Sequence, residues 1–132
     1  MPFEYITIAP FMGKDSVEPF FAYKDKHAIL LALTSNRWAA DFQFTGSADK
    51  PLFKELLVTS LSYENADRLM YVVGATKADY LKEIREIVPN AFLLIPGVGT
   101  QGGSLKDVFE NGANDQVGLL VNSSRGILYA SK

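Results

Sequence analysis

Five short apolar runs, each followed by glycine or hydroxyl residues, constrain the fold of this 132-residue chain more than any other feature. The runs are "YITIA" (5–9), "AILLAL" (28–33), "LMYVVGA" (69–75), "AFLLIP" (91–96) and "GLLVN" (118–122). They are continuously apolar rather than alternating, which is typical of parallel strands that are buried on both faces. The sequence therefore predicts five parallel strands.

Stretches with helical spacing lie between these runs, at about 16–24, 51–61, 78–88 and 104–111. Asp15 is the expected N-cap of the first helix, and Ser104 is the expected N-cap of the fourth, which Gly112 is placed to end. Strands that alternate with helices predict an α/β fold with right-handed crossovers.

The chain begins almost on its first strand, and no helix is expected after its last one. Because natural domains usually cover such sheet edges, we expect a single domain over residues 1–132 that forms part of a (β/α)8 TIM barrel. The open edges also predict a homo-oligomer.

Composition narrows the possible partners. The net charge is −2 with no block of basic residues, which argues against nucleic-acid or membrane-surface binding. No run approaches the roughly 18 apolar residues of a membrane-spanning helix. With no cysteine there is no disulfide and no thiolate zinc site, a pattern compatible with a cytoplasmic chain.

Polar clusters follow all five strands and are expected at the C-terminal edge of the sheet, where barrels build their sites. They are "PFMGKDS", "TSN", "GAT", "PGVGTQGG" and "NSSRG". Turn formation alone does not explain four glycines within residues 97–103, nor an arginine in the last cluster. Phosphate binding explains both, because glycines let the backbone approach closely and Arg125 supplies a bidentate charged partner. The N-terminal amides of the helix that Ser104 begins would add to this attraction.

The same loop also spells G-x-G-x-x-G through Gly97, Gly99 and Gly102, the fingerprint of a dinucleotide-binding turn. Such a turn expects an acidic residue at the end of the next strand, whereas that strand ends "LLVNSSRG". Because Arg125 suits a 2′-phosphate, an NADP-binding module stays open. Another phosphate-binding barrel enzyme, and a non-catalytic half-barrel that acts by assembly, also stay open.

The motifs "TSN", "VVGAT", "PGVGTQGG" and "NSSRGI", in this order, resemble the orotidine 5′-phosphate decarboxylases, and most closely a bacterial branch with "TSN" after the fifth barrel strand. The resemblance covers essentially the whole chain and implies the C-terminal portion of the barrel, about strands 4–8. Members of this family are (β/α)8 barrels, usually dimers, that convert orotidine 5′-monophosphate (OMP) to UMP and CO2 without a cofactor.

The resemblance also implies roles for individual residues. Ser35 would hydrogen-bond the pyrimidine amide edge, while Pro96 and Val98 would form the apolar wall of the base pocket. Gln101 would bridge base and phosphate. The phosphate would be held by Arg125 and the backbone near Gly126. Further substrate-binding candidates are Asn36, Gly102 and Thr76.

Departures from the family pattern limit what this chain is expected to do. The family's catalytic D-x-K-x-x-D set is absent, because no aspartate is followed by lysine two positions later. We therefore expect no catalytic residue in this chain, at most weak phosphate binding, and no decarboxylation by the chain alone. Trp38 also stands where a smaller residue is expected, and the final helix is missing.

The remaining polar residues are expected to be structural. His27, the only histidine, precedes a strand at the edge opposite the site and is expected to be solvated or capping. Asp41 and Gln43 are expected to order the loop after "TSN". No cluster of histidines or carboxylates predicts a metal site.

Overall fold

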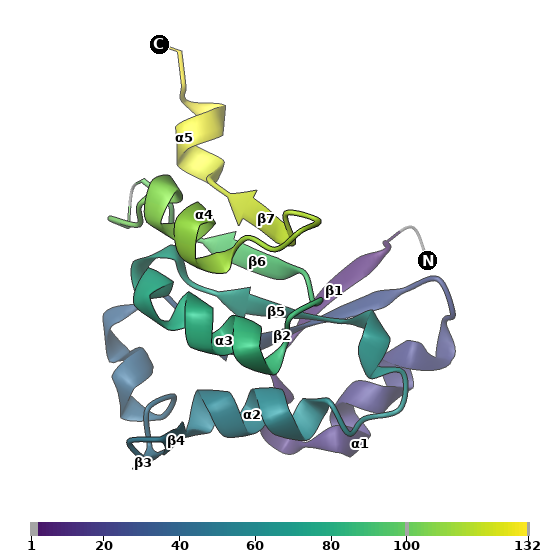
Figure 1. Ribbon diagram of the computed structural model, residues 1–132. Helices are drawn as coiled ribbons and strands as arrows, with labels where there is room; N and C mark the ends of the chain where they lie inside the picture. Colours follow the sequence, from purple (N-terminus) through teal and green to yellow (C-terminus); the bar gives the residue numbers. More distant parts are fainter. Residues whose placement is uncertain (1–2, 100, 132) are drawn as a thin grey trace.

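The computed structural model describes residues 3–99 and 101–131 and has a five-stranded parallel sheet at its centre (Figure 1). Its strands are β1 (Tyr5–Ile8), β2 (His27–Leu33), β5 (Leu69–Val73), β6 (Leu93–Pro96) and β7 (Leu119–Asn122). Their order in space is their order along the chain, β1-β2-β5-β6-β7. The prediction of five parallel strands is confirmed. Because the order never reverses, the sheet matches part of a barrel rather than a doubly wound domain.

The α-helices are α1 (Lys14–Val17), α2 (Leu52–Ser60), α3 (Leu81–Ile87), α4 (Leu105–Gly112) and α5 (Ser124–Leu128). Short 3₁₀-helices are η1 (Pro10–Met12), η2 (Glu18–Ala22), η3 (Arg37–Asp41), η4 (Ala66–Arg68) and η5 (Ala75–Tyr80). A small hairpin joins β3 (Gly46–Ser47) to β4 (Lys50–Pro51).

Three local predictions have clear outcomes. Ser104 caps α4 as expected, since its hydroxyl accepts a hydrogen bond from the Asp107 amide at 3.2 Å. The prediction that Asp15 caps the first helix is wrong, because α1 begins at Lys14 and its N-cap is Gly13. The expectation of no helix after the last strand is also wrong, because residues of the "NSSRG" cluster begin α5 instead of forming a turn.

Helices α1 to α4 lie along one side of the sheet, and α5 projects beyond the end of β7 (Figure 1). The main core lies between these helices and one face of the strands. Its fully buried side chains include Phe53 and Leu57 of α2, Ile84 of α3 and Tyr71 of β5. The Tyr71 hydroxyl is paired with the Ser60 hydroxyl at 2.8 Å, and burial raises the Tyr71 pKa.

The opposite face of the sheet carries a much smaller cluster, made by Ile29, Met70 and Val72 with Leu94 against them. Other apolar positions of the sheet stay exposed, including Leu120 at 51%. The prediction that the strands are buried on both faces is therefore correct only in part. The physical reason is that the described helices cover one face only.

His27 also differs from its prediction as a solvated or capping residue. It is the first residue of β2, half-buried, and its ring stacks on Tyr5 with the centroids 5.2 Å apart. Its Nδ1 atom is buried without a hydrogen-bond partner among the described residues.

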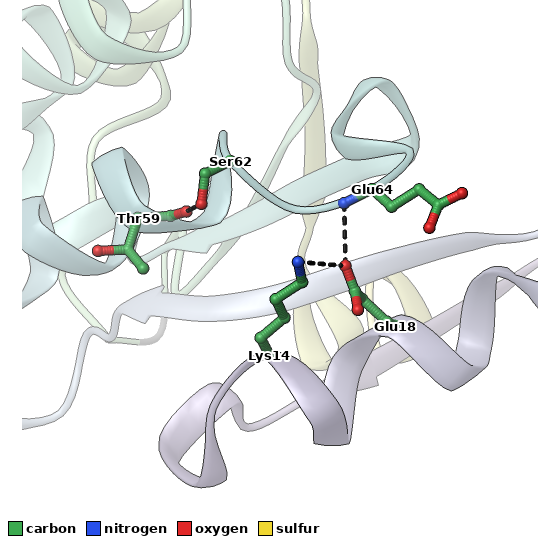
Figure 2. Close-up of polar contacts among 5 residues, drawn as sticks. All are labelled: Lys14, Glu18, Thr59, Ser62 and Glu64. Carbon is green, nitrogen blue, oxygen red and sulfur yellow. Dashed lines mark hydrogen bonds and ion pairs between the residues drawn. The ribbon is translucent and has the colours of Figure 1, made fainter.

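A carboxylate joins the first helical segment to the loop after α2 (Figure 2). Glu18 accepts a hydrogen bond from the backbone amide of Glu64 at 3.0 Å and pairs with Lys14 at 3.2 Å. Mainly because of the Glu64 amide, the pKa of Glu18 is lowered from its usual value. Nearby, the Ser62 hydroxyl donates to the Thr59 carbonyl at 2.7 Å and closes the end of α2.

Candidate functional site

The loops after β6 and β7 meet at the C-terminal edge of the sheet and enclose a small cavity of about 240 Å³. Gln101 comes from the loop after β6 and Arg125 from the first turn of α5, which follows β7, and both line this cavity. Among the described residues, its lining is Pro96, Gly97, Val98, Gln101, Asn122, Ser123, Ser124 and Arg125. Two loops that are distant in the sequence therefore converge on one volume, as the sequence predicted.

Glycine is required in the loop after β6 because the chain there adopts conformations that other residues avoid. Gly97, Gly99 and Gly102 have φ values of 93°, 79° and 89°. Backbone hydrogen bonds close the loop on itself, from the Gly102 amide to the Gly99 carbonyl and from the Gly103 amide to the Gly97 carbonyl. These amides are therefore used within the loop. Thr100 lies outside the described residues.

Ser35 lies directly beside this loop. Its hydroxyl is 3.4 Å from the Pro96 carbonyl oxygen. A Cβ atom placed on Gly97 would be 2.8 Å from Ser35 Oγ and 2.9 Å from Gln101 Oε1. The structure thus brings Ser35 and Gln101 to one glycine, whose lack of a Cβ atom leaves room for both.

The "TSN" turn is held in place by its neighbours on β5 and η5. Gly74 packs so closely against Ser35 that a Cβ atom on it would overlap the Ser35 backbone. The Thr76 hydroxyl donates to the Ser35 carbonyl at 3.1 Å. Asn36 is exposed, and its carboxamide oxygen accepts from the Thr34 hydroxyl at 2.6 Å. Thr76 and Asn36 therefore touch this turn rather than line the cavity.

The remaining candidates are placed as follows. Gly102 lies in the glycine loop and Gly126 within α5, and neither lines the cavity. Trp38 is 66% exposed, has the Arg37 guanidinium 5.1 Å from its ring centroid, and is not among the residues that line the cavity. The expectation that Gln43 orders the loop after "TSN" is confirmed by two hydrogen bonds to Thr34.

Electrostatics favour an anion in this cavity. Within the described residues its lining holds one charged side chain, Arg125, and no carboxylate. Arg125 is exposed, and its guanidinium has no hydrogen-bond or ion-pair partner in the described part of the chain. A guanidinium whose N–H donors are available, next to serine hydroxyls, is suited to bind a phosphate.

Sequence reasoning chose Arg125 from the last cluster but missed Asn122, Ser123 and Ser124, which also line the cavity. The signal was available, since all three are polar and follow a strand directly. The helix that begins at the cavity is α5 and not the α4 helix that Ser104 caps. Around the site, the described residues contain no group of three or more His, Cys, Asp or Glu side chains suited to a metal ion.

This chain is similar to known proteins in both its sequence and its fold. No protein-family model matches the chain. A curated orotidine 5′-phosphate decarboxylase from Flavobacterium johnsoniae is 58% identical over 130 residues, which cover 98% of this chain and 48% of that protein. The chain resembles orotidine 5′-phosphate decarboxylases. The resemblance predicted from the motifs is therefore confirmed.

Solved structures of orotidine 5′-phosphate decarboxylases and a UMP synthase share the fold. The UMP synthase of Leishmania donovani matches with a TM-score of 0.88 and 36% identity, covering 94% of this chain and 28% of that one. A decarboxylase from Methanocaldococcus jannaschii, complexed with the inhibitor BMP, matches with a TM-score of 0.73 and 26% identity, covering 98% of this chain and 55% of that one. The predicted fold class, part of a (β/α)8 barrel, is confirmed.

The chain spans about half the length of the curated decarboxylases it matches. Every helix in the described part of the chain is too short or too polar to cross a lipid bilayer.

Proposed function

We propose that this chain carries the phosphate- and base-binding part of an orotidine 5′-phosphate decarboxylase site. The observation that carries the proposal is the convergence of Gln101 and Arg125 on one cavity, with Ser35 beside it. The reaction of the whole site removes CO2 from OMP and adds one proton to the ring carbon, which gives UMP. The similarity to decarboxylases over nearly the whole chain supports this substrate class.

In this proposal the Arg125 guanidinium binds the phosphate and supplies its charged partner. The backbone near Gly126 and the loop around Gly102 lie next to the phosphate. Gln101 bridges phosphate and base. Ser35 hydrogen-bonds the amide edge of the pyrimidine, with Asn36 next to it in the same turn. Pro96 and Val98 form the apolar wall of the base pocket.

The charged groups that drive the chemistry are not in this sequence. When the bond to CO2 breaks, an electron pair stays on the ring carbon, so the site needs a preorganised cation and a proton donor there. No D-x-K-x-x-D set occurs in the 132 residues. We therefore propose that this chain binds nucleotide weakly and does not decarboxylate by itself.

A nucleotide titration tests the proposal against the NADP-binding alternative. We expect larger chemical-shift changes at the Arg125 and Gln101 amides with UMP than with NADP, because the proposed site holds a pyrimidine through Ser35 as well as a phosphate through Arg125. Binding of NADP in preference to UMP would overturn the assignment. Formation of UMP from OMP by this chain alone would refute the proposal that the chain lacks the catalytic residues.

We also propose that the chain is one cytoplasmic domain that self-associates. Strand β1 is an edge strand, and its Tyr5 and Ile6 side chains are exposed. Exposed apolar edge strands favour association. Light scattering should give a mass of at least two chains, and a well-folded monomer would contradict this part of the proposal.

A further inference from the structure

The side chain of Gln43 closes the segment that begins at Thr34. Its carboxamide oxygen accepts a hydrogen bond from the Thr34 amide at 2.8 Å, and its NH2 group donates to the Thr34 hydroxyl at 2.8 Å. The backbone of Gln43 is fixed as well, because its amide donates to the Ala39 carbonyl and its carbonyl accepts from the Phe53 amide. Gln43 is therefore anchored on η3 and α2 and reaches back to Thr34.

The hydrogen bonds from Gln43 to Thr34 and from Thr34 to Asn36 run in one direction through the Thr34 hydroxyl. Because the Thr34 hydroxyl accepts from Gln43, its one proton is free to donate to the Asn36 carboxamide oxygen, which lies 2.6 Å away. A reversed Gln43 carboxamide would break its bond to the Thr34 amide. Gln43 thereby fixes the residue before Ser35 and the residue after it.

We infer that Gln43 is a positioning residue for the proposed base-binding part of the site, acting on Ser35 through Thr34 and Asn36. Gln43 does not line the cavity, so it has no direct contact to offer a nucleotide there. Among the described residues, the Ser35 hydroxyl makes a single long hydrogen bond, 3.4 Å to the Pro96 carbonyl, so its position depends on how the turn that carries it is held. This inference rests on the proposed function, since it assigns Ser35 to the base.

The test compares two ligands that differ only by the base. UMP engages both parts of the site, whereas ribose 5-phosphate engages only the phosphate part around Arg125. The preference of the chain for UMP over ribose 5-phosphate, measured by NMR titration, reports on the base-binding part alone. A general loss of structure lowers both affinities together and leaves this ratio unchanged.

In Gln43→Ala we expect the preference for UMP to fall about fivefold to tenfold, as for the loss of one or two hydrogen bonds, with ribose 5-phosphate affinity unchanged. Thr34→Val removes the relay to Asn36 but keeps the bond at its amide, and should give a smaller fall. If Gln43→Ala fails to fold, Thr34→Val tests the same inference. Gln116→Ala is the matched control, because Gln116 is exposed and far from the turn in sequence.

The possible failures are distinct. If the unaltered chain binds neither ligand, or binds both equally, the proposed function fails and this inference with it. If the unaltered chain prefers UMP and both variants keep that preference, the inference is wrong while the proposed function stands. Equal weakening of both ligands would assign Gln43 a merely structural role and also overturn the inference.

Discussion

At the edge where the strands begin, two arginine side chains donate to several backbone carbonyls, whereas at the edge where the strands end Arg125 has no such partner among the described residues. Arg85 donates to the carbonyls of Gly112, Ala91 and Gly118 at 2.6, 2.6 and 2.8 Å. Arg68 donates to the carbonyls of Tyr23 and Phe21 at 2.7 and 2.9 Å. These two arginines join elements that are distant in the sequence.

Arg85 and Arg68 therefore have a structural role, whereas Arg125 is available to a ligand. Burial lowers the pKa of Arg85, yet a guanidinium remains charged in proteins, so the acceptors around it are essential. In the part of the chain that the structure describes, the Arg125 guanidinium makes no hydrogen bond or ion pair, and it lies beside a cavity. The following predictions test this contrast, from the largest expected change in the free energy of unfolding to the smallest.

Arg85→Ala should destabilise the chain most, by about 3 kcal/mol, because several part-buried carbonyls lose their donor. Chemical denaturation measures the change. Arg85→Lys, which keeps the charge but has no planar fork, should lose less. A loss under about 1 kcal/mol for Arg85→Ala would show that water replaces the guanidinium and would remove the contrast between the two edges.

Gly97→Ala should cost about 2 kcal/mol, because its added Cβ combines an unfavourable φ of 93° with contacts to Ser35 and Gln101. Gly99→Ala is the matched control. Its φ of 79° is similar, but a Cβ there meets nothing within 4 Å, so it should lose about half as much. Thermal unfolding of both variants isolates the effect of crowding, and equal losses would contradict the close approach at Gly97.

Glu18→Gln should lower the melting temperature by less than either substitution above, and only when Glu18 is ionised. The Glu64 amide, followed by Lys14, lowers the pKa of Glu18 in the folded chain below its usual 4.5. The carboxylate therefore adds stability above about pH 4.5, and this contribution is lost as the pH falls through the lowered pKa. Melting curves should differ at pH 7 and coincide in acid, whereas a difference independent of pH would contradict this account.

Arg125→Ala should change the free energy of unfolding by less than about 0.5 kcal/mol, the smallest effect in the series. The same substitution should weaken UMP binding about tenfold or more, because a charge-assisted phosphate contact is lost. Arg125→Lys should recover part of this affinity. If Arg125→Ala destabilises the chain as much as Arg85→Ala, the two arginines do not differ in kind.

The sequence predicted the parts of the molecule that follow from local patterns. The five apolar runs located the strands, and the glycines with Arg125 located the edge at which a cavity forms. It missed the carbonyl partners of Arg85 and Arg68, which are brought near only by the fold. It also missed α5, because serine, arginine and glycine residues after a strand suit a turn as well as a short helix.

The sequence also did not predict that the described helices cover only one face of the sheet, for a related reason. Continuous apolar runs indicate that both faces of the sheet are shielded from water. They do not indicate whether the helices of the same stretch of chain cover both faces. The burial of Leu30 and the exposure of Leu120 show two faces with different cover in one sheet. Likewise, Asp15 has the residue type of an N-cap, but α1 begins at Lys14, two residues before the predicted start, which leaves Asp15 inside the first turn.

The unbroken strand order has a consequence for biosynthesis. Because each strand pairs with the one translated before it, every new βα unit leaving the ribosome finds its docking surface already made. Pairing between strands that are neighbours along the chain keeps the contacts local in sequence, which favours fast folding. The loop after β6 and Arg125 each follow a strand whose pairing partner lies earlier in the chain, so the cavity depends on pairings between neighbours in sequence.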